Sequence, residues 1–516
     1  MNLRPRGIAS NDGKTKEKIH LMRTYAVLSA ILFLSTQGFS QLPGAPAPTN
    51  TAASEQPQAT TQPAPPPAME QNPPSASISP FGVFSGSGKV EKLVPGVVDL
   101  PILDAIDRGL KHNLGLLLSQ EQSAGARSQY RRNLSNLLPN VAGRVGDSVQ
   151  QINLAAFGIP LPAGLTSPVV GPFNVFDTRA ALTENLLDFN AINKLRQSAE
   201  DEKTARFNIQ DARELVVLVV GNEYLLALAA ASRLDTAQAQ LRTAQTIFLQ
   251  TQDLKKAGVA AGIDVLRAQV QMQTQQQRVL VAQQQVAEQR MGLARIIGLP
   301  VAQQFRLTDT VPYAPLPGFN LEQSLAEAYK QRPEYLAAES RVRSAELAVK
   351  AARGEALPSV QVAGDFGGLG KTFGSLESTY TLSAGLRIPI FQGGRVRADV
   401  GIAEANLRQS RLQLDDLHNR VELEVRSALL DVQTSDDEVK VAQQSIGLAS
   451  QQLKESQDRY AAGVSGSLEV VQSQEAVALA NETYIQALYL NNVAKLTLAR
   501  ALGVAEQRTR AFLGGK

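Results

Sequence analysis

The chain has 516 residues, contains neither cysteine nor tryptophan, and has only 5% aromatic residues. Without cysteine it cannot form disulfides, thiolate metal sites, a cysteine nucleophile or a lipid-modified N-terminal cysteine. The formal net charge of +3 belongs to the N-terminus, because the residues after position 40 hold 45 basic and 46 acidic side chains. This nearly neutral body gives no electrostatic support for binding nucleic acid, and we expect no such partner.

Residues 1–40 have the pattern of a secretory signal peptide, with Met22 as a possible true start. Arg23 precedes a short apolar run over residues 25–34, and the small residues at positions 38 and 40 suit signal cleavage. An N-terminal membrane anchor is the weaker alternative, because this run is shorter than the ~18 apolar residues that a membrane helix needs. No later stretch looks long and apolar enough to be a transmembrane helix.

Residues 41–95 are predicted to be a Pro-rich, disordered linker. Residues 41–80 alone hold 11 of the 26 prolines in the chain, mixed with Ala, Thr and Gln. Such a composition cannot bury enough apolar surface to offset the entropy of ordering the chain. We therefore expect the linker to be dispensable for assembly and transport.

Beyond the linker the chain repeats itself. The first half covers residues 96–300 and the second covers 320–505, with a linker at 301–319 and a C-terminal tail at 506–516. Shared motifs are Leu-Pro at 138–139 and 357–358, Gly-Val at 258–259 and 463–464, and a Gly at 298 and 503. The offset is 205 residues for the last two motifs. Periods of 20–50 residues indicate solenoids, so this much longer period indicates a duplicated structural unit.

In chain order, the first half is predicted to form a helix, two strands, a very long helix and a shorter helix. The first helix begins at Ile102, where apolar residues recur at helical spacing, and Pro139 ends it after Leu138. A period of two follows, and then a Pro-free stretch that would span roughly 100 Å as a helix. The predicted strands are 141–152 and 173–186, and the predicted later helices are 190–256 and 264–297.

The second half repeats this order. After an initial helix, strands are predicted at 358–366 and 378–391, followed by a long helix at 395–462 and a helix at 469–502. Apolar residues such as Tyr380 and Leu382 alternate with polar ones such as Thr381 and Ser383. Each strand therefore has one apolar and one polar face.

These strands are compatible with a transmembrane β-barrel, but one chain cannot close it. Four strands are too few, and eight from two chains would be filled by their own side chains, so about twelve from three chains are needed for a lumen. A soluble four-stranded sheet on a helical stalk is the alternative. Fifteen glutamines lie between residues 236 and 290. By composition alone they favour an ordinary solvated coiled coil, and the alternative is the wall of a tube with water on both sides.

Three motifs, in this order, carry a family resemblance. They are Leu-Arg-Ile-Pro-Ile-Phe-Gln-Gly-Gly-Arg at 386–395, Tyr-x-x-Gly-Val at 460–464 with Glu-Val-Val at 469–471, and Arg-Ala-Leu-Gly-Val at 500–504. With the duplication, they make the chain resemble the TolC-like outer-membrane efflux protein family (outer membrane factors).

The resemblance implies a mostly α-helical homotrimer with a transmembrane β part. Four strands from each chain would form a 12-stranded β-barrel in the outer membrane, continued by a long α-helical barrel through the periplasm. It also implies two partners, a periplasmic adaptor (membrane fusion) protein and an inner-membrane pump. The expected function is the outer-membrane channel of a tripartite efflux pump or a type I secretion system. A non-conducting periplasmic coiled-coil scaffold or tether is the alternative.

Three groups of residues are candidates for function. By resemblance, the turns at Gly258-Val259 and Gly463-Val464 dock the adaptor, although turn chemistry alone would also explain the glycines. Asp264 and Glu469 are candidates for a periplasmic constriction, and the alternative is that each only favours the helix dipole at a helix start. Pro389, Gly393 and Gly394 form the expected strand-to-helix swivel, for which the first half has no equivalent glycines.

We expect no enzyme activity, cofactor or metal site. After the signal, His112 and His418 are the only histidines in the sequence, too few for a histidine metal cage. The Gly-rich segment 367–371 lies between two predicted strands and not before a helix, so it does not fit a phosphate-binding loop. The sequence does not indicate whether the transported substrate is a drug, a metal, a polysaccharide or a protein.

Overall fold

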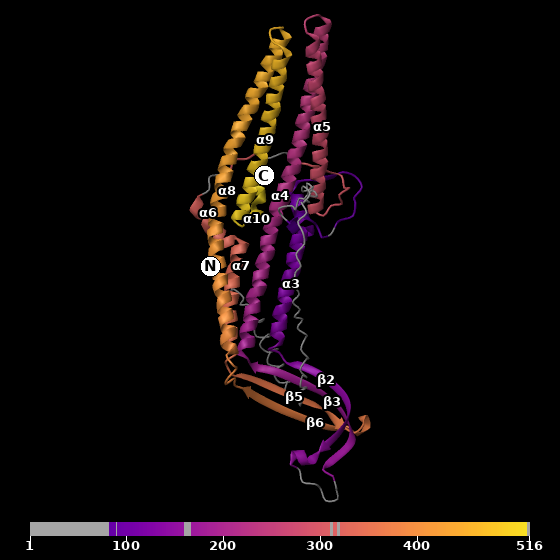
Figure 1. The fold of residues 1–516 in the computed structure, drawn as a ribbon, viewed down its shortest axis with the longest axis vertical. Helices are drawn as coiled ribbons and strands as arrows, with labels where there is room; N and C mark the ends of the chain where they lie inside the picture. The colour runs from indigo at the N-terminus through magenta and orange to yellow at the C-terminus, as the bar shows by residue number, and fades with distance from the viewer. Residues whose placement is uncertain (1–81, 89, 159–166, 310–312, 317–319, 513–516) are drawn as a thin grey trace, which may run out of the picture. The chain divides into compact units, whose positions relative to one another are not determined.

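The computed structural model describes residues 82–88, 90–158, 167–309, 313–316 and 320–512. They form two compact units, drawn in Figure 1. The sheet unit contains the described parts of Arg131–Leu195, which exclude residues 159–166, and Lys350–Val400. The helical unit contains the described parts of Ser77–Tyr130, Arg196–Val349 and Gly401–Lys516. The predicted signal peptide and most of the predicted linker lie outside the described residues.

The sheet unit contains an antiparallel sheet with the strand order β2-β3-β5-β6. The bounds are β2 (Asn140–Asn153), β3 (Val169–Leu187), β5 (Ser359–Gly370) and β6 (Glu377–Arg387), with short 3-10 helices η2 (Leu154–Phe157) and η3 (Phe373–Ser375). Because β3 pairs with β5, the two halves of the chain meet in the middle of the sheet. The predicted strand 378–391 was too long, since β6 ends at Arg387 and Pro389 has no N–H for a ladder.

One face of this sheet is apolar and the other is polar. Phe366 lies opposite Tyr380 in the register, and Tyr380 is 75% exposed. On the other face, the Arg179 Nε lies 2.6 Å from the Asp177 Oδ1, and its Nη1 lies 3.2 Å from the Asp365 Oδ1. The apolar face is therefore bare in a single chain, and the polar face carries its own charge pairs.

The two strand-to-helix joints are built differently. In the second half, Gly393 and Gly394 take φ values of +60° and +82° just before α8 (Arg395–Ala461). Positive φ is strained for residues with a Cβ, so glycine suits both positions. In the first half, the Asp188 Oδ1 accepts a hydrogen bond from the Ala191 N at 3.0 Å and caps α4 (Phe189–Lys256). A capping carboxylate thus begins the first long helix without glycine.

The predicted first helix, Ile102 to Leu138, is in fact two helices. They are α2 (Ile102–His112) and α3 (Leu114–Ser135), and Asn113 between them is extended. The Asn113 side chain accepts from the Gly115 N at 2.9 Å and donates to the Phe84 O at 2.6 Å. The apolar periodicity continues across this break, which is why it does not reveal it.

The end of the predicted disordered linker is ordered, which corrects that prediction for residues 82–88 and 90–95. A short 3-10 helix, η1 (Gly82–Ser85), places the Phe84 ring against Gly115. The Gly88 N donates to the His112 O at 2.9 Å, and the Arg108 Nη1 lies 2.7 Å from a carboxylate oxygen of Glu91. This segment begins after the last of the clustered prolines, so the composition of residues 41–80 says nothing about it.

The remaining helices are α5 (Gly262–Ile296), α6 (Leu321–Gln331), α7 (Pro333–Gly354), α9 (Ser467–Ala501) and α10 (Ala505–Phe512). The predicted linker at 301–319 contains β4 (Phe305–Leu307), which pairs in parallel with β1 (Val98–Leu100). The predicted tail contains α10, whose Phe512 is buried. Both connecting segments therefore take part in the folded helical unit.

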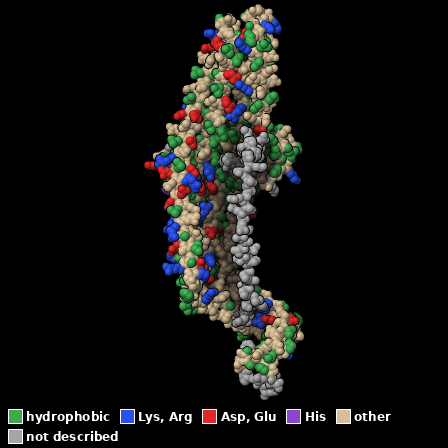
Figure 2. All heavy atoms as spheres, viewed as in Figure 1, with side chains coloured by type: hydrophobic (Ala, Val, Ile, Leu, Met, Phe, Trp, Pro, Cys, Tyr) green, Lys and Arg blue, Asp and Glu red, His purple; other side chains and the backbone are tan. Residues whose placement is uncertain are grey.

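The core of the helical unit is built around the middle of α4. Val216, Val220 and Tyr224 are fully buried there, beside Leu293 and Leu498. Contrary to expectation, α4 contains an 18-residue stretch that is long and apolar enough to cross a membrane, and 61% of this stretch is buried. It is therefore the central core helix of this unit. On the face drawn in Figure 2, apolar side chains are interspersed with polar and charged ones.

Candidate functional site: the helical turns and the seam between the hairpins

Two helical hairpins carry the candidate site. Hairpin 1 is α5 with α4 from Arg196 onward, and hairpin 2 is α9 with α8 from Gly401 onward. Each has its own apolar seam. In hairpin 1, Ala237 packs with Ala282, and in hairpin 2 Ala442 packs with Ala487. These positions differ by 205, so the offset read from the sequence also relates the two packed structures.

The turn of each hairpin ends with an exposed valine. Gly258 and Gly463 have φ values of +76° and +73°. The Val259 N donates to the Leu254 O at 2.9 Å, and the Val464 N donates to the Arg459 O at 3.1 Å. These bonds, after a left-handed glycine, are those of a Schellman C-cap. The valines are 64% and 68% exposed, and the turn itself does not require their apolar side chains.

Asp264 links the two turns. Its Oδ2 accepts from the Ala261 N at 3.3 Å, which caps α5, and its Oδ1 accepts from the Ser467 Oγ at 2.6 Å, across to hairpin 2. Arg267 lies 3.5 Å away, and the Asp264 side chain is only 20% exposed. Glu469 is more open, at 43% exposed, and its carboxylate lies 3.3 Å from the Arg459 Nε. Within one chain, each predicted constriction carboxylate thus has a cationic neighbour.

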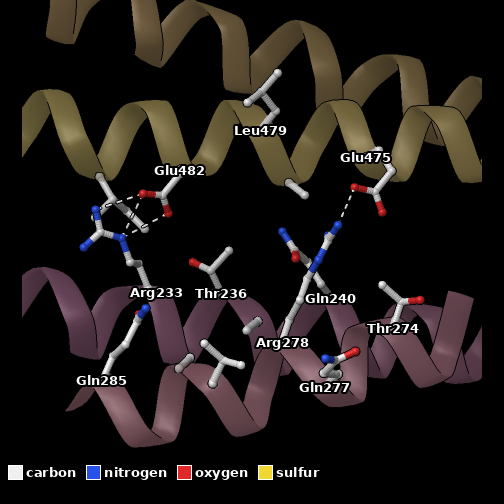
Figure 3. A pocket seen from close by; sticks show the side chains of 15 residues that line it. Arg233, Thr236, Gln240, Thr274, Gln277, Arg278, Gln285, Glu475, Leu479 and Glu482 are labelled. Carbon is white, nitrogen blue, oxygen red and sulfur yellow. Dashed lines mark hydrogen bonds and ion pairs between the residues drawn. The ribbon is translucent and has the colours of Figure 1, made fainter. Parts of the chain in front are cut away.

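Between the hairpins lies a groove lined by α4, α5 and α9, with ion pairs across it (Figure 3). The Arg233 Nε donates to the Glu482 Oε1 at 2.9 Å. The Arg278 Nη2 donates to the Glu475 Oε2 at 2.8 Å, and the Gln271 Nε2 donates to the other carboxylate oxygen at 2.8 Å. Ionic and polar contacts therefore cross this groove, beside apolar residues such as Leu479 and Ile485.

The charge state of Glu475 follows from these contacts. Burial alone would raise its pKa, but the hydrogen bonds and charge of Arg278 and the hydrogen bond of Gln271 outweigh that effect and lower the pKa. The carboxylate therefore stays ionised and paired at neutral pH. Sequence reasoning did not identify these residues. Arg233 and Arg278 belong to the first repeat, whereas Glu482 and Glu475 lie 249 and 197 positions after them, so no local pattern in the sequence pairs them.

At the other end of the helical unit, Glu214 anchors α10. Its side chain is buried, and its two oxygens accept from the Ala505 N at 2.5 Å and the Glu506 N at 3.3 Å. Burial raises the pKa of Glu214 to about 7, although these two backbone hydrogen bonds oppose the rise. An acidic side chain inside an apolar stretch of α4 was the sequence signal for this cap.

The two histidines have structural partners. The His112 Nε2 lies 3.1 Å from the Glu91 Oε1, and the His418 ring stacks on Tyr329 with centroids 4.3 Å apart. Within the described ranges, no three His, Cys, Asp or Glu side chains gather as a metal ion would require.

Comparison with known proteins decides the family. A family described as "Outer membrane efflux protein" matches residues 105–299 and 325–504, which is most of both halves. The chain belongs to the outer membrane efflux protein family. This confirms the resemblance seen in the sequence, and it places the protein in the outer membrane.

Several family members align along nearly their whole length. The chain is 24% identical to the pyoverdine export outer membrane protein OpmQ of Pseudomonas putida, over 78% of this chain and 86% of OpmQ. It is 27% identical to outer membrane protein OprJ of Pseudomonas aeruginosa, over 79% of this chain and 85% of OprJ. The cation efflux system protein CusC of Escherichia coli is 23% identical over 79% of this chain and 87% of CusC.

Solved structures share the fold. A crystal structure of CusC matches with a TM-score of 0.67 at 20% identity, over 81% of this chain and 99% of that one. The Campylobacter jejuni CmeC outer membrane channel matches with a TM-score of 0.67 at 17% identity, over 82% and 92%. The predicted fold class, a duplicated and mostly helical chain with a transmembrane β part, is confirmed.

Proposed function

We propose that the protein is a homotrimeric channel that passively conducts substrate from the periplasm to the exterior. It would serve as the outer-membrane component of a tripartite efflux pump or type I secretion system. The observation that carries this proposal is the open sheet. β2 and β6 are its edge strands, and neither has a second partner strand among the described residues. Long unpaired edges invite further strand pairing, and a barrel removes them.

The two faces of the sheet suit a membrane barrel. Three chains would supply about twelve strands, enough for a lumen. The apolar face, with Val145 at 72% and Tyr380 at 75% exposure, would meet lipid. The opposite face, with Arg179 between Asp177 and Asp365, would meet water in the lumen. A soluble sheet would leave the apolar face exposed.

The exposed turns support an adaptor protein as a partner. Val259 and Val464 belong to the hydrogen-bonded turn of each hairpin and leave their side chains exposed, where an adaptor would find an apolar contact. The relatives carry names that refer to pyoverdine export and to cation efflux. Relatives with one architecture thus differ in cargo, so we propose that the pump and adaptor select the substrate.

Conductance measurements test the proposal. The purified protein should migrate as a heat-sensitive trimer from the membrane fraction and open discrete conducting pores in planar bilayers. A non-conducting scaffold predicts a periplasmic protein with no pores. Recovery in the soluble periplasm, or trimers that never conduct, would reject the channel in favour of the scaffold.

A further inference from the structure

The repeat relates two grooves of the helical unit. Groove 1 is the groove between hairpin 1 and α9 described above, and groove 2 lies along hairpin 2 between α8 and α9. Hairpin 1 contributes ten residues to groove 1. For nine of them, the equivalent residue in the second repeat, 205 positions later, lines groove 2. Examples are Arg233 with Glu438, Thr236 with Val441, Gln240 with Ser445, Arg278 with Thr483, and Gln285 with Leu490.

The two grooves differ in what covers them. Groove 1 is covered by α9 of the same chain, and its Ile485 is only 7% exposed there. Groove 2 has no helix over it among the described residues, and its apolar residues Leu430, Val441 and Leu490 are 64%, 63% and 40% exposed. One of two equivalent surfaces is therefore occupied and the other is bare.

The same relation identifies the occupant. The α9 residues that cover groove 1 correspond to α5 residues 205 positions earlier, so Ile485 corresponds to Leu280 and Glu475 to Val270. Leu280 and Val270 are 61% and 62% exposed in the chain. Hairpin 1 already contacts α9 through groove 1, and this exposed flank of α5 is open to another copy. A contact of this kind joins different surfaces and closes into a ring under rotation.

We propose that α5 of one copy lies in groove 2 of the next copy and forms the contact between chains. This inference rests on the proposed homotrimer. The seam between chains would then differ chemically from the seam within a chain. In the contact between chains, Thr483 and Val270 take the places of Arg278 and Glu475. Glu438 and Gln277 take the places of Arg233 and Glu482. The seam between chains would therefore lack these two ion pairs, because Thr483 would face Val270 and Glu438 would face Gln277, although groove 2 keeps the carboxylates of Asp437, Glu438 and Glu482.

The natural absence of cysteine allows a direct test by cross-linking. V270C/T483C is treated in membranes with a short bifunctional maleimide and run on a denaturing gel. We expect a ladder of covalent dimers and trimers, and none from either single variant. The matched control is R278C/E475C, the equivalent pair in the seam within a chain, which should cross-link inside one chain and run as a monomer. A reagent is preferable to a disulfide, since long side chains bridge the equivalent pair.

A second cysteine pair, together with a native gel that reports the trimer, separates failure of this contact from failure of the trimer. L280C/V441C probes the same seam at the equivalents of Ile485 and Thr236, and should also give covalent oligomers. Trimers on the native gel without cross-links between chains from either pair would overturn this inference and leave the homotrimer standing. Absence of native trimers from the unmodified protein would overturn both. Co-expression of V270C and T483C on differently tagged chains should give dimers that carry both tags.

Discussion

At Asp264, one carboxylate caps α5 and also accepts a hydrogen bond from Ser467 of the other hairpin. This position therefore combines a structural role with its predicted role in a periplasmic constriction. Six carboxylates, from Asp264 and Glu469 in three chains, would favour cations. Their neighbours Arg267 and Arg459 partly offset this charge, so we expect weak selectivity.

Removal of these charges tests the constriction. We expect D264N/E469Q trimers to lose their cation preference in planar bilayers, measured as a shift of the reversal potential in a salt gradient. The cost in stability should be about 0.3–1 kcal/mol per helix start. S467A is the matched control, because it breaks the link between the turns and leaves both charges in place. Cation selectivity that survives in D264N/E469Q would place the constriction elsewhere.

The exposed valines of the turns support a second prediction. V259D/V464D should abolish export while trimers still form, because two charged side chains would replace the apolar contact that an adaptor needs. Export of a substrate in cells and trimers on a native gel are the two measurements. V301D is the control, since Val301 is also exposed, at 56%, but lies outside both turns. Normal export from V259D/V464D would reject docking at these turns.

Glu214 predicts a pH dependence of stability. Its pKa is about 7 when folded and near the ordinary 4.5 when unfolded, so the folded state binds more protons between these values. The contribution of Glu214 to the free energy of unfolding is largest below about pH 4.5 and is lost as the pH rises through about 7. This loss amounts to at most about 3 kcal/mol. E214Q keeps an acceptor for α10 without the charge, so its unfolding temperature should change less between ~pH 5 and ~pH 8.

Local chemistry explains which site residues the sequence could reveal. Gly258 and Gly463 follow from turn chemistry, because helix ends of this type require a left-handed residue. The contact between Arg278 and Glu475 could not be predicted, because it joins residues 197 positions apart. It depends on the register of one hairpin against the other, which no local pattern of residues records.

At the scale of elements, the long helices and strands follow from periodicity, and the exceptions have physical causes. α4 begins at Phe189 and ends at Lys256, close to the predicted 190–256, because a Pro-free stretch ends at a glycine turn. The break at Asn113 escaped prediction, because its capping partners include Phe84, which is far from it in the sequence. The helix α10 also escaped, because its buried cap, Glu214, is 291 residues away from Ala505.

The ordered segment after residue 81 changes the prediction for the linker. Deletion of residues 42–81 should leave trimers and export intact, because their composition cannot form a core. Extension of the deletion through residue 95 should lower the unfolding temperature, since it removes the Phe84 contact with Gly115 and the Glu91–Arg108 pair. The cost should be up to about 1.5–3 kcal/mol for the aromatic side chain. Equal unfolding temperatures for the two deletions would show that the segment contributes nothing.

At the scale of the whole molecule, substitutions can introduce into the proposed contact between chains an ion pair equivalent to the Arg278–Glu475 pair of groove 1. V270E/T483R places a glutamate and an arginine at the equivalents of Glu475 and Arg278. We expect V270E alone to weaken the trimer and the double variant to restore it, with a gain of about 0.2–1 kcal/mol per new pair. The temperature at which trimers dissociate should then fall as salt is added, because salt screens exposed pairs. A trimer equally stable in V270E and V270E/T483R would show that these residues do not meet.

The duplication itself has a consequence for symmetry. A ring of six identical half-chains would have a single kind of contact, and any substitution would alter all six contacts at once. A duplicated chain lets the two halves diverge, so the equivalent positions 278 and 483 can hold a charged arginine and a neutral threonine. In the proposed trimer, the three contacts within chains and the three between chains can then differ, and a single substitution changes only one of the two kinds.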